Sequence, residues 1–469
     1  MLEPQNAAAA SLPVDPHEGL APVAVTGDWE AAHLVTDSMR ATVIRVAMPA
    51  VASSLLMTLF SSVDAFWVGT RIGSTGLAAV STSLFWIWMI ISLAEMIGVG
   101  LTAVAARRRG EARHEEAARL GGDTLVFSVV LGAAVAIVGI LNLPHLFALM
   151  QTSVDVTTLG STYLHVFLLG TPLIYGFFAI DAMFRAAGDT RTPFLLLLTS
   201  VGITLVLDPA LILGLGPFPK IGIAGAAIAT ITTRGAAFVL GLVLVVRRGL
   251  LKIGRVRMTS IVAVCRIGLP TAVTGVFFSL IYVFLTRTTT KFGTPALAAL
   301  GIGHRVESWL FMIGVGFGAA TAAIVGQNLG AGRPDRAEDA GWLATAYCTA
   351  AGVVAFALEL TLPRQFASLF TSDPAVIEES VKYLRIAAIS QLAVCAEIVL
   401  EGALGGAGET VPPMVASTTL TASRVPLASW AAARWGSIGI WWVLSITAMA
   451  RGVAMAALWR AGRWKRRSV

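Results

Sequence analysis

The chain has 469 residues, of which 56% are hydrophobic and 13% are charged, and its mean hydropathy is +0.79. Soluble domains carry about 25% charged residues, so this composition excludes a soluble protein and indicates an integral membrane protein. The net charge of +7 does not indicate nucleic-acid binding, because the basic residues lie in the loops between apolar runs, as membrane topology requires.

The apolar runs have the length of transmembrane helices, not that of the ~10-residue alternating segments of outer-membrane barrels. Only helices and closed barrels satisfy their backbone hydrogen bonds in lipid, so the predicted fold class is all-α. The sequence predicts twelve transmembrane helices, in chain order at 43–69, 76–104, 120–143, 158–184, 193–215, 221–246, 263–290, 296–328, 338–361, 378–404, 411–433 and 437–459.

The two halves of the chain repeat each other. Residues 96–100 (MIGVG) recur at 312–316, and Ala187-Gly-Asp-Thr190 recurs as Ala407-Gly-Glu-Thr410. Each half holds six spans, an even number, so both halves insert with the same orientation. This predicts two six-helix lobes related by a parallel pseudo-two-fold repeat, the architecture of a rocking secondary transporter. A duplicated membrane scaffold is the alternative.

The repeat also sets the predicted domain boundaries. Residues 1–40 mix Ala, Pro and acidic residues and lack the basic region of a signal peptide, so they form a disordered cytoplasmic tail. The first lobe covers 41–247 and the second covers 263–460. A basic cytoplasmic linker at 248–262 joins them, and residues 461–469 form a basic cytoplasmic tail.

Basic residues gather in alternate loops, which predicts the orientation. The positive-inside rule places both termini in the cytoplasm of a multi-pass protein of the plasma (inner) membrane. The arginine-rich loops contain Arg107–Arg109, Arg113, Arg119, Arg185, Arg191, Arg247, Arg248, Arg255, Arg257, Arg333, Arg336, Arg460, Arg463, Arg466 and Arg467.

Asp64 ends the uncharged run 46–63, and a carboxylate inside an apolar span is a functional candidate by default. The helical rise places Asp64, Asp208 and Thr230 at similar depth, in the outer half of three spans of one lobe. Two carboxylates in a low dielectric cannot both ionise cheaply, so the pair would hold a proton. With water and the Thr hydroxyl it could instead hold Na⁺. Alternatively, Asp64 reaches the lipid headgroups and Asp208 is a helix-end or kink residue.

The second lobe differs, since Leu285 occupies the position aligned with Asp64. Its possible polar site consists of His304, Glu307 and Arg424. His304 and Glu307 are three apart on one helical face and could form a second proton or cation site. The alternative is an ion pair between Glu307 and one of three arginines, Arg305, Arg424 or Arg451.

Asp181 and Arg185 are four residues apart near a helix end, which predicts a structural salt bridge. Glu401, the repeat partner of Asp181, has the same interpretation. Aromatic and Met side chains in the second span suit a cleft for aromatic cations, although ordinary lipid contact explains each of them singly. These residues are Phe85, Trp86, Trp88, Met89 and Met96.

From about residue 40 to 460 the chain resembles the multidrug and toxic compound extrusion (MATE) family, and its DinF-like branch more than its NorM-like one. In order and on a repeated set of twelve spans, five motifs carry this resemblance. They are Asp64 with 66–69 (FWVG), 188–193 (GDTRTP), 207–209 (LDP), 222–227 (GIAGAA) and 325–332 (VGQNLGAG).

The resemblance implies antiport of organic cations against H⁺ or Na⁺. It also implies a first-lobe cation site at Asp64, Thr204, Asp208 and Thr230. Thr204 departs from the family's usual Asn, which removes an amide ligand for Na⁺. The arginines at 107–109 stand where a Gln-containing motif is common, and Leu285 replaces the acidic residue of NorM-like proteins.

We therefore expect a monomeric proton-coupled exporter of amphipathic organic cations or drugs that works by alternating access. It would contact membrane lipid and no nucleic acid, and it would use H⁺, alternatively Na⁺ at Asp64 and Asp208, as coupling ion with no other cofactor or metal. The alternatives are a Na⁺-coupled antiporter, a lipid-linked precursor flippase and a channel. No nucleophile–base pair, phosphate loop or Cys/His metal cluster supports an enzyme.

Overall fold

The computed structural model describes residues 34–72, 74–150 and 154–467, and these are almost entirely helical. The predicted tail at 1–40 therefore lies mostly outside the described residues. The helices are α1 Met39–Arg71, α2 Ser74–Gly110, α3 His114–Leu149, α4 Val154–Ala186, α5 Arg191–Leu213, α6 Ile223–Arg247, α7 Met258–Thr290, α8 Gly293–Gly330, α9 Pro334–Thr361, α10 Pro363–Ser368, α11 Pro374–Ala388, α12 Gln391–Gly406, α13 Val411–Arg460 and the 3₁₀ turn η1 Arg463–Arg466.

The predicted spans correspond to these helices, with two differences in form. Span 10 is broken: α11 and α12 together cross the apolar layer and are bent by 57° at their junction. Spans 11 and 12 run on as α13, which is kinked at Gly436. Counted this way, the described residues contain the twelve predicted spans, and the all-α membrane fold is confirmed.

Gly436 and Gly222 show that the repeat extends to the backbone conformation before the last span of each lobe. The torsions of Gly436 are φ 64° and ψ −150°, and those of Gly222, which precedes α6, are φ 65° and ψ −136°. A side chain strongly disfavours positive φ, so glycine is needed at both positions. Gly436 therefore separates the last two spans in the way that Gly222 introduces the last span of the first lobe.

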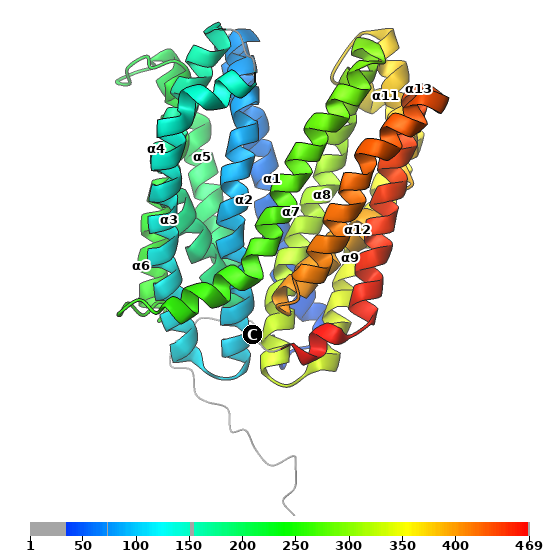
Figure 1. The fold of residues 1–469 in the computed structure, drawn as a ribbon. Coiled ribbons are helices and arrows are strands. Elements are labelled where there is room, and N and C mark those ends of the chain that lie inside the picture. The colour runs from blue at the N-terminus through cyan, green and yellow to red at the C-terminus, as the bar shows by residue number, and fades with distance from the viewer. Residues whose placement is uncertain (1–33, 73, 151–153, 468–469) are drawn as a thin grey trace, which may run out of the picture. The chain divides into compact units, whose positions relative to one another are not determined.

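The helices form two bundles, α1–α6 and α7–α13, and α1 contacts both (Figure 1). The first half of α1, including Val43, Val46 and Ala50, belongs to one apolar core with residues of α8, α9 and α12. Further along, Phe60 packs against Leu197 and Val201 of α5. Thus α1 starts in the second lobe and ends in the first.

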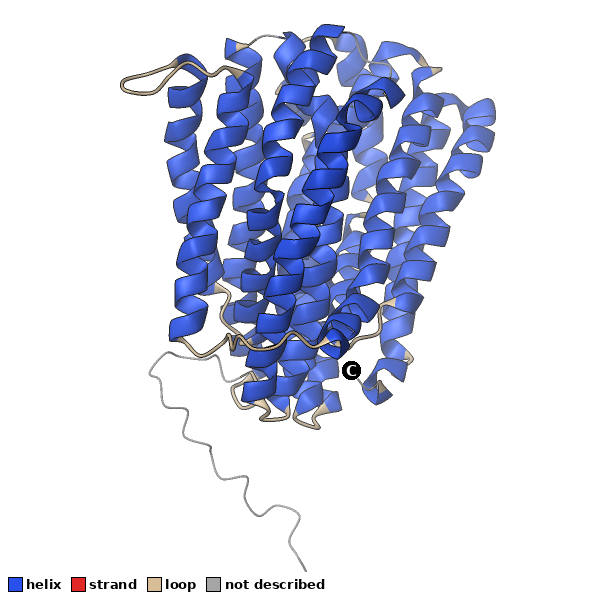
Figure 2. Ribbon diagram, turned by 60° about the vertical axis from the view of Figure 1, so that its left-hand side comes forward, coloured by secondary structure: helices blue, strands red, loops and turns tan. Residues whose placement is uncertain are grey.

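The first helix of the second lobe, α7, crosses in the opposite direction (Figure 1), within a structure whose described elements are helices joined by loops (Figure 2). Near its start, a Cβ added to Gly268 of α7 would lie 1.9 Å from the main-chain oxygen of Met96 in α2. Further along, Leu285 packs in a core with residues of α8, α11 and α13. Since Pro49 lies inside α1 and Pro270 inside α7, both crossing helices carry a residue that favours bending.

Both described chain ends pack against the second lobe. Asn328 donates a 3.1 Å hydrogen bond to the main-chain oxygen of Leu34, and Arg333 donates one of 2.9 Å to that of Val35. In the predicted basic tail, Trp464 is fully buried and stacks on Trp459 with ring centroids 3.9 Å apart. The tail at 461–467 therefore folds back onto α13.

Candidate functional site in the first lobe and its second-lobe counterpart

In the first lobe, α5 carries three polar side chains at helical spacing on one buried face. Ser200, Thr204 and Asp208 are 4%, 2% and 0% exposed. Residues four apart stack on the same helix face, so the three form one polar stripe within an apolar bundle. Sequence reasoning missed Ser200, although its spacing of four from Thr204 could have revealed it.

Thr204 connects this stripe to α6. Its Oγ1 lies 2.7 Å from Oγ1 of Thr233 and donates a 2.8 Å hydrogen bond to the main-chain oxygen of Ser200. The predicted partner, Thr230, is half-buried on the same helix and contributes its main-chain oxygen to Thr233 at 3.1 Å. The hydroxyl that meets Thr204 is therefore that of Thr233, one turn from the predicted residue.

The fourth predicted member, Asp64, lies in the helical backbone of α1, but its side chain is outside the described residues. The grouping of Asp64 with Asp208 thus stays a prediction. From the described part, the site offers hydroxyl oxygens from α5 and α6 and one fully buried carboxyl from α5. Such a set of oxygens suits a proton or a small hard cation.

A cationic side chain that the sequence reading missed lies beside this site. Arg234 is four residues after Thr230, hence on the same face of α6. Its Nη2 lies 2.7 Å from the sulfur of Met57 on α1. No carboxylate forms a salt bridge with Arg234 among the described residues. An arginine inside a span is a functional candidate for the same reason as a carboxylate.

The second-lobe residues Glu307, His304 and Arg424 have separate partners. Glu307 accepts a 3.0 Å hydrogen bond from the Tyr383 hydroxyl, and Nδ1 of His304 lies 3.4 Å from the Tyr282 hydroxyl. Arg424 is 4% exposed and donates a 2.8 Å hydrogen bond to Thr447. Among the described residues, Glu307 therefore has a phenol as its hydrogen-bonding partner, and no ion pair with Arg305, Arg424 or Arg451 is found there.

Three further carboxylates of this lobe have partners that the sequence did not predict. Both oxygens of Glu359 accept from the Gln391 amide, at 2.8 and 2.9 Å. Glu397 pairs with Arg451 at 2.9 Å, whereas no ion pair of Glu401 is found in the described ranges. Glu379 accepts a 3.0 Å hydrogen bond from Trp441. These partners lie 32 to 62 residues away in the chain, so no local pattern reveals them, in contrast to the pair of Glu379 with Lys382 three residues on.

The two lobes are in contact at the end of α4 and along α1 and α8. The Gln327 side chain of α8 donates a 2.7 Å hydrogen bond to the main-chain oxygen of Ala186 at the end of α4. A Cβ on Gly316 of α8 would lie 2.4 Å from the Cα of Val51 on α1, so the backbones touch there. The predicted Asp181–Arg185 salt bridge forms at 2.6 Å and is confirmed.

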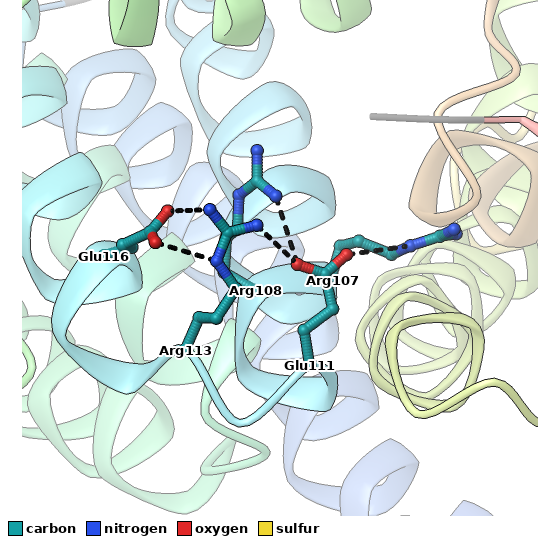
Figure 3. A network of polar contacts seen from close by, with 5 residues as sticks. All are labelled: Arg107, Arg108, Glu111, Arg113 and Glu116. Carbon is teal, nitrogen blue, oxygen red and sulfur yellow. Dashed lines mark hydrogen bonds and ion pairs between the residues drawn. The ribbon is translucent and has the colours of Figure 1, made fainter.

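Ion pairs also organise the turn between α2 and α3. Glu111 lies between Arg107 on one side and Arg108 and Arg113 on the other (Figure 3). Burial alone would raise the pKa of Glu111, but hydrogen bonds from Arg108 and Arg113 outweigh it and hold that pKa below its ordinary value. Ion pairs therefore stabilise this turn, whereas close backbone packing at glycine stabilises the contact between α8 and α1.

Known proteins resemble the chain over 71% to 92% of its length. A probable multidrug resistance protein NorM of Thermotoga maritima is 27% identical over 92% of this chain and 94% of the relative. An FAD transporter of Shewanella oneidensis is 29% identical over 71% and 75%. A multidrug export protein MepA of Staphylococcus aureus is 22% identical over 85% and 89%.

Solved structures show the same fold at low identity. A transporter from Pyrococcus furiosus, whose binding pocket is described as having reverse polarity, superposes with a TM-score of 0.87 at 22% identity, covering 94% of this chain and 99% of that one. The bent form of a Vibrio cholerae MATE transporter gives a TM-score of 0.81 at 23% identity over 92% and 99%. The MatE family model matches residues 49–210 and again 270–430, one match in each lobe. The chain therefore belongs to the MatE family and is a multi-pass membrane transporter, not an enzyme.

Proposed function

We propose that this protein exports amphipathic organic compounds across the plasma membrane in exchange for protons, as a member of the DinF-like branch. The observation that carries the proposal is the buried stripe of Ser200, Thr204 and Asp208 on one face of α5, which includes a fully buried carboxyl. A buried carboxyl in a membrane is costly, and a proton removes that cost. The multidrug names of the relatives support a drug-like substrate.

Coupling follows from the position of the proton site at α1. Asp64 lies on the same helix that packs against the second lobe through Val46 and Ala50. A proton taken up by Asp64 and Asp208 removes charge between α1 and α5. The preferred bend of α1 then changes, and the contact that α1 makes between the two lobes changes as a result. The protein thus binds substrate and proton in alternation, with the arginine-rich ends in the cytoplasm.

The decisive experiment measures substrate efflux driven by a pH gradient in proteoliposomes. Asp64→Asn and Asp208→Asn each remove a titrating group at nearly constant volume, and we expect pH-driven efflux to be lost. Glu378→Gln is the matched control, since Glu378 pairs with Arg364 at an exposed helix end. Unchanged efflux in Asp64→Asn overturns the assignment.

Sodium coupling is the second candidate, supported by the oxygen atoms of Thr204, Thr233 and Asp208 on facing helices. The same vesicles test it with a Na⁺ gradient at zero pH gradient. Efflux under that condition, and none with protons alone, favours Na⁺.

A substrate with negative charge is also supported by two observations. Arg234 and Arg424 are cationic side chains inside spans that have no salt bridge among the described residues, and one relative is named an FAD transporter. A dinucleotide carries phosphate groups that arginine recognises. Competition of FAD with a cationic dye for efflux distinguishes the two substrate classes.

A further inference from the structure

The second lobe contains a broken span with a carboxylate bound on each side of the break. α11 ends at Ala388, α12 begins at Gln391, and the two are bent by 57°. Glu307 of α8 accepts the hydroxyl of Tyr383 on α11, whereas Glu359 of α9 accepts the amide of Gln391 on α12. Broken transmembrane helices recur at the ion and substrate sites of transporters because they free polar groups inside the membrane.

Both carboxylates have neutral donors as their hydrogen-bonding partners. Glu359 is 3% exposed and Glu307 is half-buried, and their donors Gln391 and Tyr383 are each 2% exposed. Within the described ranges, no Lys, Arg or His forms a salt bridge with Glu307 or Glu359. An ionised carboxylate in such a place has no counter-ion to offset its desolvation.

The two carboxylates also lie within electrostatic range of each other. On the neighbouring helices, the charged and titratable groups that face them are few. They are Tyr282 on α7, His304 on α8, Tyr383 and the Glu379–Lys382 pair on α11, Glu397 and Glu401 on α12, and Arg424 and Arg451 on α13. Lys382 and Arg451 are paired with other glutamates, and Arg305 on α8 is exposed. Among the described residues, Arg424, hydrogen-bonded to Thr447, is therefore the buried cation that remains near Glu307. One buried positive charge stabilises one negative charge, and a second ionised carboxylate has no partner.

We propose that Glu307 and Glu359 together bind one proton and form a second coupling site at the break in span 10, which deepens the proposed proton antiport. Glu359 lies against the start of α12, where the free backbone N–H groups favour a negative charge. Ionised Glu359 binds the start of α12 through Gln391, and protonation of Glu359 weakens this interaction. The proton thus sets the angle between α11 and α12 in the second lobe.

The test is a pH titration of the full-length protein in lipid nanodiscs by difference infrared spectroscopy, which detects the C=O stretch of protonated carboxyl groups. Glu307→Gln/Glu359→Gln keeps the side-chain volumes and a carbonyl acceptor for Tyr383. We expect this double variant to bind about one proton fewer than the native protein between roughly pH 5 and pH 9. Glu378→Gln, the exposed control on α11, should not change the count.

A titration that is identical in the native protein and the double variant overturns the proposal. If the double variant does not fold, each single variant is read in the same way, because two carboxyls that share a proton titrate together. The Asp64→Asn variant must keep the second-lobe signal. Loss of transport coupling in Asp64→Asn and loss of the infrared signal in the glutamate variants are separate results, so the failure of either proposal is recognised independently.

Discussion

The side-chain amide of Gln327 donates a 2.7 Å hydrogen bond to the main-chain oxygen of Ala186 and so joins the second lobe to the first. Gln327→Leu removes this bond and leaves a buried carbonyl without its donor. One such bond contributes about 1 kcal/mol, so we expect the population with separated arginine-rich ends to rise about fivefold. Distances between spin labels at the exposed positions Arg247 and Arg460 measure that separation.

The labels require a background in which Cys265, Cys348 and Cys395 are replaced, and this background must transport normally. A distance distribution unchanged by Gln327→Leu would show that the hydrogen bond does not hold the lobes together.

Close backbone packing between α7 and α2 predicts a stronger effect at Gly268. Gly268→Ala places a methyl group 1.9 Å from the oxygen of Met96, so the helices must separate. Overpacking of this kind costs about 1–3 kcal/mol, and we expect slower transport and a longer distance between the same labels. Gly202→Ala on α5, where nothing lies within 4 Å of the new methyl group, is the control and should behave like the native protein.

A substitution at Thr204 tests the proposed ion preference of the first lobe. Thr204→Asn restores the amide that related proteins are expected to carry, beside Thr233 and one turn from Asp208. One added oxygen ligand is worth about 1 kcal/mol, which corresponds to about fivefold tighter Na⁺ binding. Efflux at increasing Na⁺ measures this gain. Thr199→Asn, on the exposed side of α5, should show none, and the same absence in Thr204→Asn would remove Thr204 from the ion site.

The buried pair of Glu397 and Arg451 should stabilise the second lobe only as a pair. Their side chains are 6% and 12% exposed and meet at 2.9 Å. Glu397→Gln leaves a guanidinium without its carboxylate, a change that costs about 3–5 kcal/mol when a buried pair loses one partner. Thermal unfolding in detergent measures the loss. The double variant Glu397→Gln/Arg451→Met should recover most of it, and equal destabilisation in both variants would contradict the pairing.

The turn between α2 and α3 should weaken in acid (Figure 3). The pKa of Glu111 in the folded protein lies below its ordinary value of 4.5, since hydrogen bonds from Arg108 and Arg113 outweigh burial. A lowered carboxyl pKa contributes stability that is complete above the unfolded pKa and disappears as the pH falls through the folded one. The melting temperatures of native protein and Glu111→Gln should therefore differ by a constant amount above about pH 4.5 and converge below it. A difference that persists in strong acid would assign the effect to packing.

The sequence predicts the membrane fold well, because apolar length and repeated motifs are local signals. Arg45-x-x-x-Pro49 and Arg266-x-x-x-Pro270 mark the first helix of each lobe, and Gly436 falls in the gap predicted between spans 11 and 12. The break within span 10 was not predicted, since the run 378–404 contains no proline and its one glycine, Gly402, lies well after the break.

The polar sites were predictable only in part. Asp208 could be found from its depth in an apolar span, and Thr204 was named only through the family resemblance. Thr233 was missed because the side on which α6 meets α5 depends on packing. Glu359 was not singled out at all. Its partner Gln391 is 32 residues away on a helix that exists only because span 10 is broken.

The crossing of α1 and α7 has a consequence for how the chain can be divided. Residues of α1 such as Val43 and Ala50 complete a core built from α8, α9 and α12, and α7 at Gly268 packs against α2. A polypeptide cut within 248–257 would therefore give two fragments, each lacking a helix segment that its own interior requires. The two repeated halves of the sequence are therefore not independent folding units. The two fragments should assemble when they are produced together, and neither should be stable when it is produced alone.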